Sequence, residues 1–331
     1  MNPFGKLPDP RHAFDHDEAA QAFADILDAR ASEDEIEAFL FALTARGETM
    51  VEIAAAAQAM RDRLIPIDAP AGAIDVCGTG GDGHHTLNVS TAVSLVVAAC
   101  EVPVAKHGNR AASSKSGAAD TLEALGLNME RAGQNAEETL KDLGICFLFA
   151  ANHHPAMKRI MPIRQRIGQR TIFNLMGPLA NPARVTRQLI GIARPAYVPI
   201  YAEALHHLGT EHSRVISGDE GLDELSLAGG NEVAIVEPDG VRYQRITAAD
   251  AGLSAYPVEA IRGGDAAHNA LELRKLLQGE HGAYRDAVLF NAAAALMVAG
   301  VVDTMPEGVE EAAEAIDKGL ANTLLNCWVA Y

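Results

Sequence analysis

The sequence contains few cysteines. The four thiols, at Cys77, Cys100, Cys146 and Cys327, are too sparse in 331 residues to form a disulfide scaffold. They form neither a CxxC pair nor the Cys/His spacing of a zinc site. We therefore expect reduced thiols buried in the core.

Cations are scarce as well. Lys and Arg together number 27 against 44 Asp and Glu, which gives a formal net charge of −17. This balance argues against broad, sequence-independent nucleic-acid binding, because such binding depends on neutralising phosphates with cations. It leaves room for a small phosphorylated ligand, which needs only a few local donors. Since 48% of the residues are hydrophobic and 21% are charged, a disordered or fibrous chain is excluded.

No apolar run has the length of a membrane span. The longest, at 287–302, is shorter than the roughly 20 residues required and is interrupted by Asn291. Residues 1–14 contain three prolines and no apolar signal-peptide region. We therefore expect a soluble, cytoplasmic protein without a membrane partner.

The beginning of the chain is predicted to be entirely helical. At about 150 residues per domain, the length favours two domains and leaves one large domain as the alternative. Within 17–65, Ser32 with Glu35 and Thr49 with Glu52 have the spacing of capping boxes, and each pair precedes an apolar periodic run. These signals predict a small helical domain over 1–66.

After a predicted linker at 66–72, short apolar runs alternate with helical stretches such as 92–100, 118–125 and 196–208. Strands are predicted at 73–77, 102–106, 145–149, 189–193, 214–217 and 232–237. Most of these runs are apolar throughout, which is typical of parallel strands covered on both faces. We expect an α/β domain over 73–331 with a mostly parallel central sheet.

A glycine-rich segment, GTGGDG at 78–83, follows the first predicted strand. Its glycines let backbone N–H groups turn toward an anion. The segment also fits the GxGxxG pattern of dinucleotide-binding folds, which require an acidic residue at the end of the second strand. Lys106 and His107 stand there instead. An NAD-dependent oxidoreductase is therefore disfavoured, whereas an NADP-dependent one stays open.

Two further segments suit a phosphorylated ligand. NVST at 88–91 precedes an apolar helix, so it is either a simple N-cap or a phosphate site at a helix N-terminus. KHGNR at 106–110 and SSKSG at 113–117 place three cations and three serines after the second predicted strand. They form either a polyphosphate clamp or a solvated basic loop. Open α/β sheets bind ligands at the carboxyl ends of their strands, where both segments are predicted to lie.

Two more segments are candidates for metal and carboxylate binding. Asp223 and Glu224 end an acidic run at 219–224, which is either a solvated turn or a Mg²⁺ site, because Mg²⁺ prefers one or two carboxylates together with substrate phosphates. An arginine within 162–170 could hold a substrate carboxylate through a bidentate fork. The adjacent pair His153-His154 is expected to be a structural turn, since neighbouring side chains point apart.

Together these segments resemble the anthranilate phosphoribosyltransferase family over nearly the whole chain. The resemblance rests on GTGGD at 78–82, NVST at 88–91, KHGNR at 106–110 with SSKSG at 113–117, Arg164 within PIR, TIFNLMGPLANP at 171–182, and Asp223-Glu224 within GLDE. Six such segments in one order are very specific.

The resemblance implies a nucleoside phosphorylase-type fold, with a contribution to the helical domain from about 165–185 and a homodimer joined through the helical domains. It implies transfer of the phosphoribosyl group from 5-phospho-α-D-ribose 1-diphosphate to the amine of anthranilate. The products would be N-(5-phospho-β-D-ribosyl)anthranilate and pyrophosphate, in the second step of tryptophan biosynthesis from chorismate. The implied cofactor is Mg²⁺, with two ions per subunit.

Site residues follow from the resemblance position by position. Contacts to the diphosphate substrate are implied for Gly78, Gly81, Asp82, Thr86, Asn88, Val89, Ser90, Thr91, Lys106, His107, Gly108, Asn109, Arg110, Ser113 and Ser114. Anthranilate would contact Gly78, Asn109 and Arg164, and Mg²⁺ would bind Ser90, Asp223 and Glu224. Lys106 and Arg110 would stabilise the leaving diphosphate, and no residue would act as a covalent nucleophile. His84-His85 and Ala151-Asn152 depart from the family pattern beside the site.

Three other functions stay open. A pyrimidine nucleoside phosphorylase of the same fold would need a nucleobase site in place of the Arg164 segment. An NADP-dependent oxidoreductase would bind nicotinamide cofactors without added metal. A non-catalytic phosphate-binding protein would hold the diphosphate substrate without releasing pyrophosphate.

Overall fold

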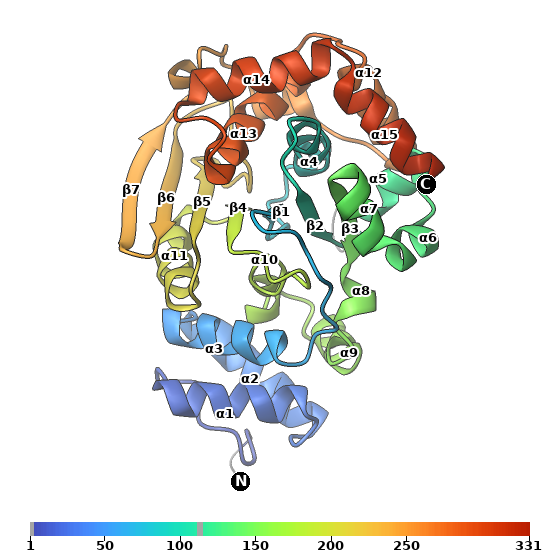
Figure 1. The fold of residues 1–331 in the computed structure, drawn as a ribbon. Helices are drawn as coiled ribbons and strands as arrows, with labels where there is room; N and C mark the ends of the chain where they lie inside the picture. The colour runs from blue at the N-terminus through green and yellow to red at the C-terminus, as the bar shows by residue number, and fades with distance from the viewer. Residues whose placement is uncertain (1–2, 111–114) are drawn as a thin grey trace.

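The computed structural model describes residues 3–110 and 115–331, with a small helical domain beside a larger α/β domain (Figure 1). The helical domain contains α1 (His16–Leu27), α2 (Glu33–Arg46) and α3 (Met50–Arg61). Both predicted capping boxes are confirmed: the Ser32 and Thr49 hydroxyls accept hydrogen bonds from the backbone N–H groups of Glu35 and Glu52, each at 3.3 Å. The sequence signals therefore predicted where α2 and α3 begin.

The α/β domain is built on a seven-stranded sheet in the order β3-β2-β1-β4-β5-β6-β7. Its strands are β1 (Ile74–Gly78), β2 (Val104–Gly108), β3 (Ile145–Phe149), β4 (Arg187–Gly191), β5 (His212–Gly218), β6 (Asn231–Glu237) and β7 (Gly240–Ile246). The first five are parallel, and β6 and β7 are antiparallel to their neighbours. The expected mostly parallel sheet is therefore confirmed.

The strand boundaries differ from the prediction in an informative way. The predicted strand 102–106 is wrong in its boundaries, because β2 runs from Val104 to Gly108 and includes Lys106 and His107. The prediction ended the strand too early because it followed the apolar residues. Lys106 and His107 are polar but buried, and they belong to the strand. The edge strand β7 was not predicted, because its central residues are exposed and polar, as suits a sheet edge.

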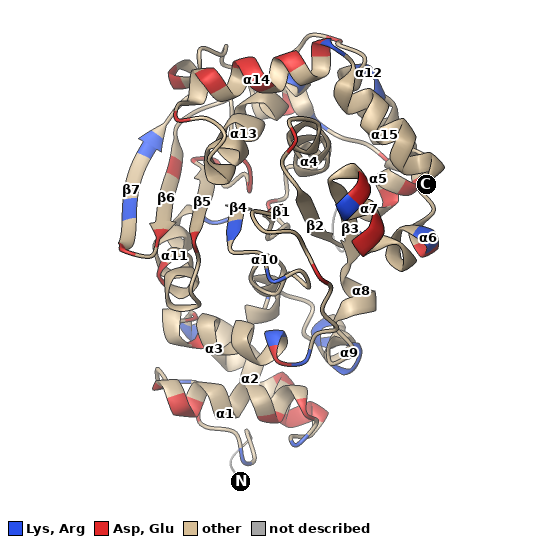
Figure 2. Cartoon of the chain, in the orientation of Figure 1, with Lys and Arg blue, Asp and Glu red and all other residues tan. Residues whose placement is uncertain are grey.

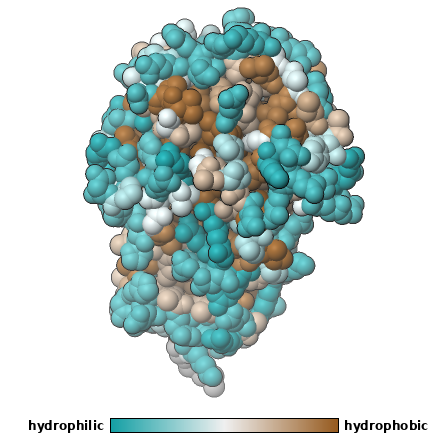
Figure 3. Space-filling view, in the orientation of Figure 1, coloured by the Kyte–Doolittle hydropathy of each residue, from teal (hydrophilic) through white to brown (hydrophobic). Residues whose placement is uncertain are grey.

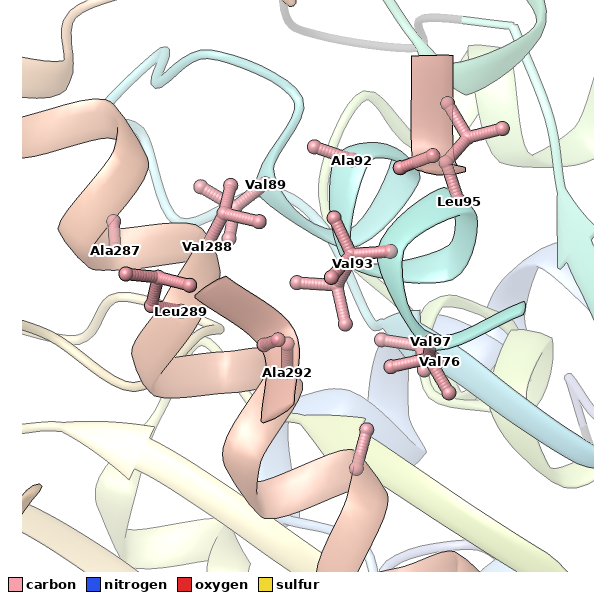
Figure 4. Packing of buried hydrophobic residues seen from close by; sticks show 14 of the residues in the cluster. Val76, Val89, Ala92, Val93, Leu95, Val97, Ala287, Val288, Leu289 and Ala292 are labelled. Carbon is pink, nitrogen blue, oxygen red and sulfur yellow. The ribbon is translucent and has the colours of Figure 1, made fainter. Parts of the chain in front are cut away.

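Helices cover both faces of the sheet, and the side chains of adjacent strand residues pack on opposite faces. Leu189 belongs to the core beneath α4 (Val89–Ala99) and α13 (Ala283–Ala299), whereas Ile190 belongs to the core that reaches the helical domain. Figure 4 shows Val93 of α4 beside Ala292 of α13 in the first of these cores. Burial on both faces explains why the strands are apolar throughout.

The remaining helices surround this frame. The first core is closed by α5 (Ala118–Ala124), α12 (Ala266–Leu277), α14 (Met305–Asp317) and α15 (Leu320–Ala330). Other described helices are α6 (Met129–Gln134), α7 (Ala136–Leu143), α8 (Ala150–His153), α9 (Met157–Ile167), α10 (Met176–Leu179) and α11 (Val198–His207), with the 3-10 helices η1 (Ile172–Asn174), η2 (Pro195–Tyr197), η3 (Ala248–Ala251) and η4 (Val258–Ile261).

A later part of the chain packs onto the helical domain. α9 contacts α2, and α10 contacts α3. Ile163 of α9 and Phe173 of η1 lie in the same apolar core as Phe39 of α2. This arrangement places α9 below α8 and against the helical domain (Figure 1).

The surface agrees with the charge balance of the sequence. Acidic residues are distributed along α14, while basic residues gather around α9 (Figure 2). The face seen in Figure 3 is largely hydrophilic, with hydrophobic residues in separate patches over the α/β domain. Within residues 3–110 and 115–331, none of the helices combines the length and apolarity that a membrane span requires.

The cysteine prediction is only partly confirmed. All four thiols are free, and Cys146 is buried in the core. Cys77 and Cys100 are half-buried, and Cys327 is exposed, so the prediction of core burial is wrong for Cys327. It lies on the last helix, α15, one face of which is open to solvent.

Candidate functional site

The loops that follow β1 and β5 meet at the carboxyl edge of the sheet. The backbone N–H of Gly80 donates to Asp223 Oδ2 at 2.6 Å, and the backbone N–H of Ser90 donates to Glu224 Oε1 at 3.2 Å. A Cβ on Gly78 would lie 2.3 Å from Asp223 Oδ2, so only glycine permits this approach. The structure thus brings together residues that are more than 130 positions apart in the sequence.

The glycine-rich loop has the backbone that its composition predicts. Gly80, Gly81 and Gly83 have φ values of 68°, 73° and 81°, in the left-handed region that favours glycine. Asp82 lies among them, and its Oδ1 accepts a hydrogen bond from the His84 backbone N–H at 3.1 Å. The chain reaches α4 only at Val89, well after β1 ends at Gly78, unlike a dinucleotide-binding loop, where a helix opens at once.

The N-terminus of α4 has no cap from its own N-cap side chain, and one of its hydroxyls lacks a partner in the described part of the chain. Asn88 occupies the N-cap position, yet its side chain makes no capping hydrogen bond. The Thr91 hydroxyl is buried and has no hydrogen-bond partner in the described part of the chain. Helix N-termini attract anions through unsatisfied N–H groups and the helix dipole, so these residues form a candidate anion-binding site.

Asp223 and Glu224 are half-buried carboxylates that face this helix start. Burial raises the pKa of both, and the charge of Asp82 raises the pKa of Asp223 further. Such shifts indicate a shortage of positive charge around the pair. The described residues contain no group of three or more His, Cys, Asp or Glu side chains arranged to hold a metal. Two carboxylates suit Mg²⁺ when substrate phosphates complete its coordination shell.

Lys106 lies beneath the anion-binding site. Its exposed fraction is 2%, and its Nζ donates to the Val76 carbonyl at 2.8 Å and to Ser90 Oγ at 3.4 Å. Its charge lowers the otherwise raised pKa values of Asp75 and Glu224. A buried ammonium that contacts Ser90 is well placed to act on a bound phosphate.

His107 faces away from this site. Its Nδ1 lies 2.8 Å from the Gly177 carbonyl, and its Nε2 lies 3.3 Å from His154 Nε2. Burial, together with His154, lowers the pKa of His107 to about 3, so its ring is neutral. The His107 side chain therefore packs under α10, and the structure does not bring it to the glycine-rich loop.

Arg110 is held by acidic residues of α5 rather than by the site. Its guanidinium pairs with Asp120 at 2.9 Å and with Glu123 at 2.6 Å. The neighbouring Asn109 accepts a hydrogen bond from the Arg110 backbone N–H at 2.8 Å. In this conformation the positive charge of Arg110 is already compensated. Ser113 and Ser114, which were assigned to the same loop, lie outside the described residues.

Arg164 is a cation without an anionic partner in the described part of the chain. It lies in the last turn of α9, half-buried, and its Nη1 lies 3.5 Å from Met161 Sδ. Burial lowers its pKa, and Arg170 adds to the shift. A half-buried guanidinium without a carboxylate is suited to binding a carboxylate from outside the chain.

Arg170 is a site residue that the sequence analysis missed. Its Nη1 donates to the carbonyls of Gly80 and Gly81 at 2.8 and 2.9 Å. It thereby ties the segment after α9 to the glycine-rich loop. The stretch 162–170 contains three arginines, and no sequence signal distinguishes the one that reaches the loop. The resemblance singles out Arg164, and only the tertiary structure gives Arg170 its contact with the loop.

The pair His153-His154 lies at the end of α8 and is not the expected turn, because His153 is the last residue of the helix and His154 is its C-cap. His153 Nδ1 lies 2.9 Å from the Ile65 carbonyl, whereas His154 faces His107. The two rings thus contact different segments, and neither belongs to a metal-ligating cluster of the described residues. The pair connects the end of α8 to the linker and to β2.

Comparisons with known proteins agree with this arrangement. Residues 7–64 match the glycosyl transferase family, helical bundle domain, and residues 71–322 match the glycosyl transferase family, a/b domain. The chain is 80% identical over 331 residues, the full length of both proteins, to anthranilate phosphoribosyltransferase of Sphingopyxis alaskensis.

Solved structures are similar over the same length. A crystal structure of anthranilate phosphoribosyltransferase from Thermus thermophilus has a TM-score of 0.92 at 40% identity and covers 100% of this chain and 99% of its own. The Saccharomyces cerevisiae enzyme in complex with PRPP and Mg has a TM-score of 0.87 at 26% identity and covers 96% and 93%. The likeness therefore spans both domains.

Proposed function

The chain belongs to the anthranilate phosphoribosyltransferase family and transfers a phosphoribosyl group to anthranilate, and we propose that the site at the carboxyl edge of the sheet performs this transfer. The donor is 5-phospho-α-D-ribose 1-diphosphate. The products are N-(5-phospho-β-D-ribosyl)anthranilate and pyrophosphate, in the second step of tryptophan biosynthesis from chorismate.

The observation that best supports this location is the unsatisfied start of α4. The Thr91 hydroxyl is buried without a partner among the described residues, and the Asn88 side chain does not cap the helix. A buried hydroxyl without a partner costs free energy, and a phosphate oxygen would satisfy it. We assign the phosphates of the donor to this helix start, to the glycine-rich loop and to Lys106.

The residues beside the helix fit Mg²⁺. Asp223 and Glu224 are half-buried, and their carboxylates accept hydrogen bonds from backbone N–H groups. Mg²⁺ would neutralise the diphosphate and make it a better leaving group. The assignment of Ser90, Asp223 and Glu224 as its ligands, and of two ions per subunit, belongs to this proposal.

The reaction requires little acid–base chemistry from the protein. The neutral amine of anthranilate forms the new bond to C1 of the ribose while the bond from C1 to the diphosphate oxygen breaks, and the amine then loses a proton. Positive charge develops on the ribose and negative charge on the leaving diphosphate. Lys106 and the N-terminus of α4 stabilise that negative charge, and fixed orientation of the two substrates contributes the rest. Arg110 would join them only after leaving Asp120 and Glu123.

The competing functions receive less support. A nucleobase has no carboxylate, so a nucleoside phosphorylase would leave Arg164 without a partner. The long loop between β1 and α4 differs from the tight turn of an NADP-dependent oxidoreductase. The relatives named above are transferases rather than binding proteins.

We also propose a homodimer joined through the helical domains in the cytoplasm. The proposal rests on the sequence resemblance, and Phe41 of α2, which is 56% exposed, is an apolar side chain that such a contact would cover. Size-exclusion chromatography with light scattering measures this directly. A mass of one chain at micromolar concentration would contradict the dimer.

The assignment of Arg164 is tested by kinetics. Arg164→Ala is expected to raise the KM for anthranilate at least tenfold, equivalent to about 1.4 kcal/mol, because the substrate carboxylate loses its cation. The KM for the diphosphate substrate should change much less. Arg164→Lys should recover only part of the loss, since an ammonium lacks the planar fork.

Arg166 provides a matched control on the same helix. It is exposed and pairs with Glu33 and Glu37 of α2. Arg166→Ala should leave both KM values near those of the wild type. Equal damage to both substrates by Arg164→Ala would indicate a folding or domain-closure defect and would remove Arg164 from the anthranilate site.

Arg170 is expected to affect binding of the diphosphate substrate rather than binding of anthranilate. Arg170→Met removes two hydrogen bonds to the glycine-rich loop, each worth about 0.5–1.5 kcal/mol. The KM for the diphosphate substrate should rise by about fivefold to a hundredfold, measured at saturating anthranilate. An unchanged value would show that Gly80 and Gly81 hold their conformation without Arg170.

A further inference from the structure

The side-chain oxygen of Asn88 is fully occupied by two donors. Thr121 Oγ1 on α5 donates to Asn88 Oδ1 at 2.5 Å, and Asn269 Nδ2 on α12 donates to the same oxygen at 2.8 Å. A carbonyl oxygen has two lone pairs, so both are used. The Asn88 amide nitrogen has no hydrogen-bond partner in the described part of the chain.

The orientation of Asn269 is itself set by the backbone. Its side chain is buried, and its Oδ1 accepts a hydrogen bond from the Gly264 N–H at 2.8 Å. A backbone N–H can only donate, so it must face the amide oxygen of Asn269. The Asn269 amide nitrogen is therefore directed toward Asn88.

Thr121 completes the arrangement from the opposite side. Its hydroxyl has one proton, which it donates to Asn88, so it accepts the hydrogen bond that joins it to Ser116 Oγ at 2.8 Å. Ser116 belongs to the SSKSG segment. The network therefore connects Ser116, α5 and α12 to a single amide at the start of α4.

The Asn88 backbone is held as well. Its carbonyl accepts hydrogen bonds from Tyr284 Oη at 3.2 Å and from the Ala92 N–H at 3.2 Å. Within the part of the chain that the structure describes, these contacts leave the Asn88 side chain with one free group, an NH₂ that can only donate. At a helix start suited to anions, such a donor selects a phosphate oxygen.

We propose that Asn269 and Thr121 are positioning residues, which hold the Asn88 amide with its nitrogen toward the phosphates of the diphosphate substrate. This inference rests on the proposed function, in which Asn88 contacts that substrate. Neither residue touches the substrate itself. Without them the amide could rotate, and in its flipped orientation it would present a carbonyl oxygen to an anion.

Asn269→Asp tests the orientation with little change in shape. The carboxylate still accepts from the Gly264 N–H, but it cannot donate to Asn88 Oδ1. The Asn88 amide should then turn its nitrogen toward the carboxylate and its oxygen toward the phosphates. The KM for the diphosphate substrate should rise at least about tenfold, while the KM for anthranilate changes less than about twofold.

Thr121→Val removes the second hydrogen-bond donor to Asn88 Oδ1 with almost no change in side-chain shape. We expect the KM for the diphosphate substrate to rise several-fold. Thr139→Val on α7 is the matched control, because Thr139 is equally buried but its hydroxyl donates only to the Ala136 carbonyl of its own helix. That variant should keep the wild-type KM for both substrates. Thermal melting of each variant identifies any that fail to fold.

Combining the substitutions distinguishes positioning from a purely structural role. If Asn269 acts through Asn88, Asn269→Asp should have no further effect on the KM for the diphosphate substrate once Asn88→Ala is present. Additive effects of the two substitutions would overturn the inference. If Asn88→Ala alone leaves that KM unchanged, the proposed phosphate contact of Asn88 fails. If it raises the KM while Asn269→Asp does not, only the positioning role fails.

Discussion

Replacing Asp223 with Asn and Glu224 with Gln in one protein is expected to lower kcat/KM by at least about a hundredfold, equivalent to about 2.7 kcal/mol. The substitutions keep the shape of both side chains but remove the charges that would hold Mg²⁺ against the diphosphate. The Mg²⁺ concentration required for half-maximal rate should rise. Loss of anthranilate fluorescence, followed over a series of Mg²⁺ concentrations, measures both effects.

The same variant should remain folded. Both carboxylates are half-buried without a cationic hydrogen-bond partner in the described residues, and partial desolvation of such charges costs free energy. Its melting temperature without Mg²⁺ should therefore equal or exceed that of the wild type. The stabilisation that Mg²⁺ and the diphosphate substrate together give the wild type should be lost.

Asp219 and Glu220 supply a control from the same acidic run. Asp219 pairs with Arg245 at 2.7 Å, and the Glu220 side chain contacts Ser226. Asp219→Asn with Glu220→Gln changes the charge equally but should leave the Mg²⁺ dependence unaltered. If both double variants behave alike, or if the Asp223/Glu224 variant keeps wild-type kinetics at limiting Mg²⁺, the acidic run is only a solvated turn.

Removing the charge of Lys106 is expected to weaken binding of the diphosphate substrate far more than binding of anthranilate. A lost charge-assisted hydrogen bond costs about 1.5–3 kcal/mol, or about tenfold to a hundredfold in affinity. Lys106→Ala tests the loss of the amine, and Lys106→Met retains most of the buried volume. Titration calorimetry with the diphosphate substrate and Mg²⁺ should detect the change in both variants.

The structure also predicts how these variants differ in stability. The Lys106 charge acts on the buried carboxylate of Asp75 and on the half-buried carboxylate of Glu224, so its loss should lower the melting temperature as well. Lys106→Met should be the more stable of the two, because it leaves a smaller cavity. Unchanged binding of the diphosphate substrate by a folded variant would reject the role given to Lys106.

The resemblance of the sequence to a family identified most residues of the candidate site. The structure shows which of these residues lie close together. Ser90, Lys106, Asp223 and Glu224 meet at one edge of the sheet. Two assignments are not brought together with them: the His107 ring packs under α10, and Arg110 pairs with α5. Polar residues in a motif share a sequence segment, but successive residues of a strand point to opposite faces.

Short sequence patterns were sufficient to predict the elements whose structure depends on residues close together in the chain. Capping boxes and apolar periodicity predicted the helical domain, and continuous apolar runs predicted a parallel sheet buried on both faces. They misplaced β2 because its last residues are polar and buried, and they missed the exposed edge strand β7. In both cases the environment of the strand, rather than its own composition, determined where it lies.

The sequence by itself determined the fold class, the phosphate-binding segments and, through their order, the family. The resemblance selected Arg164 for the substrate carboxylate, but only the tertiary structure decided that Arg170 of the same basic stretch reaches the glycine-rich loop. It also revealed Asn269, which lies 181 residues from Asn88 in the chain and contacts it in the fold. The physical reason is that hydrogen-bond direction depends on which donors and acceptors meet, and distant segments meet only once the chain has folded.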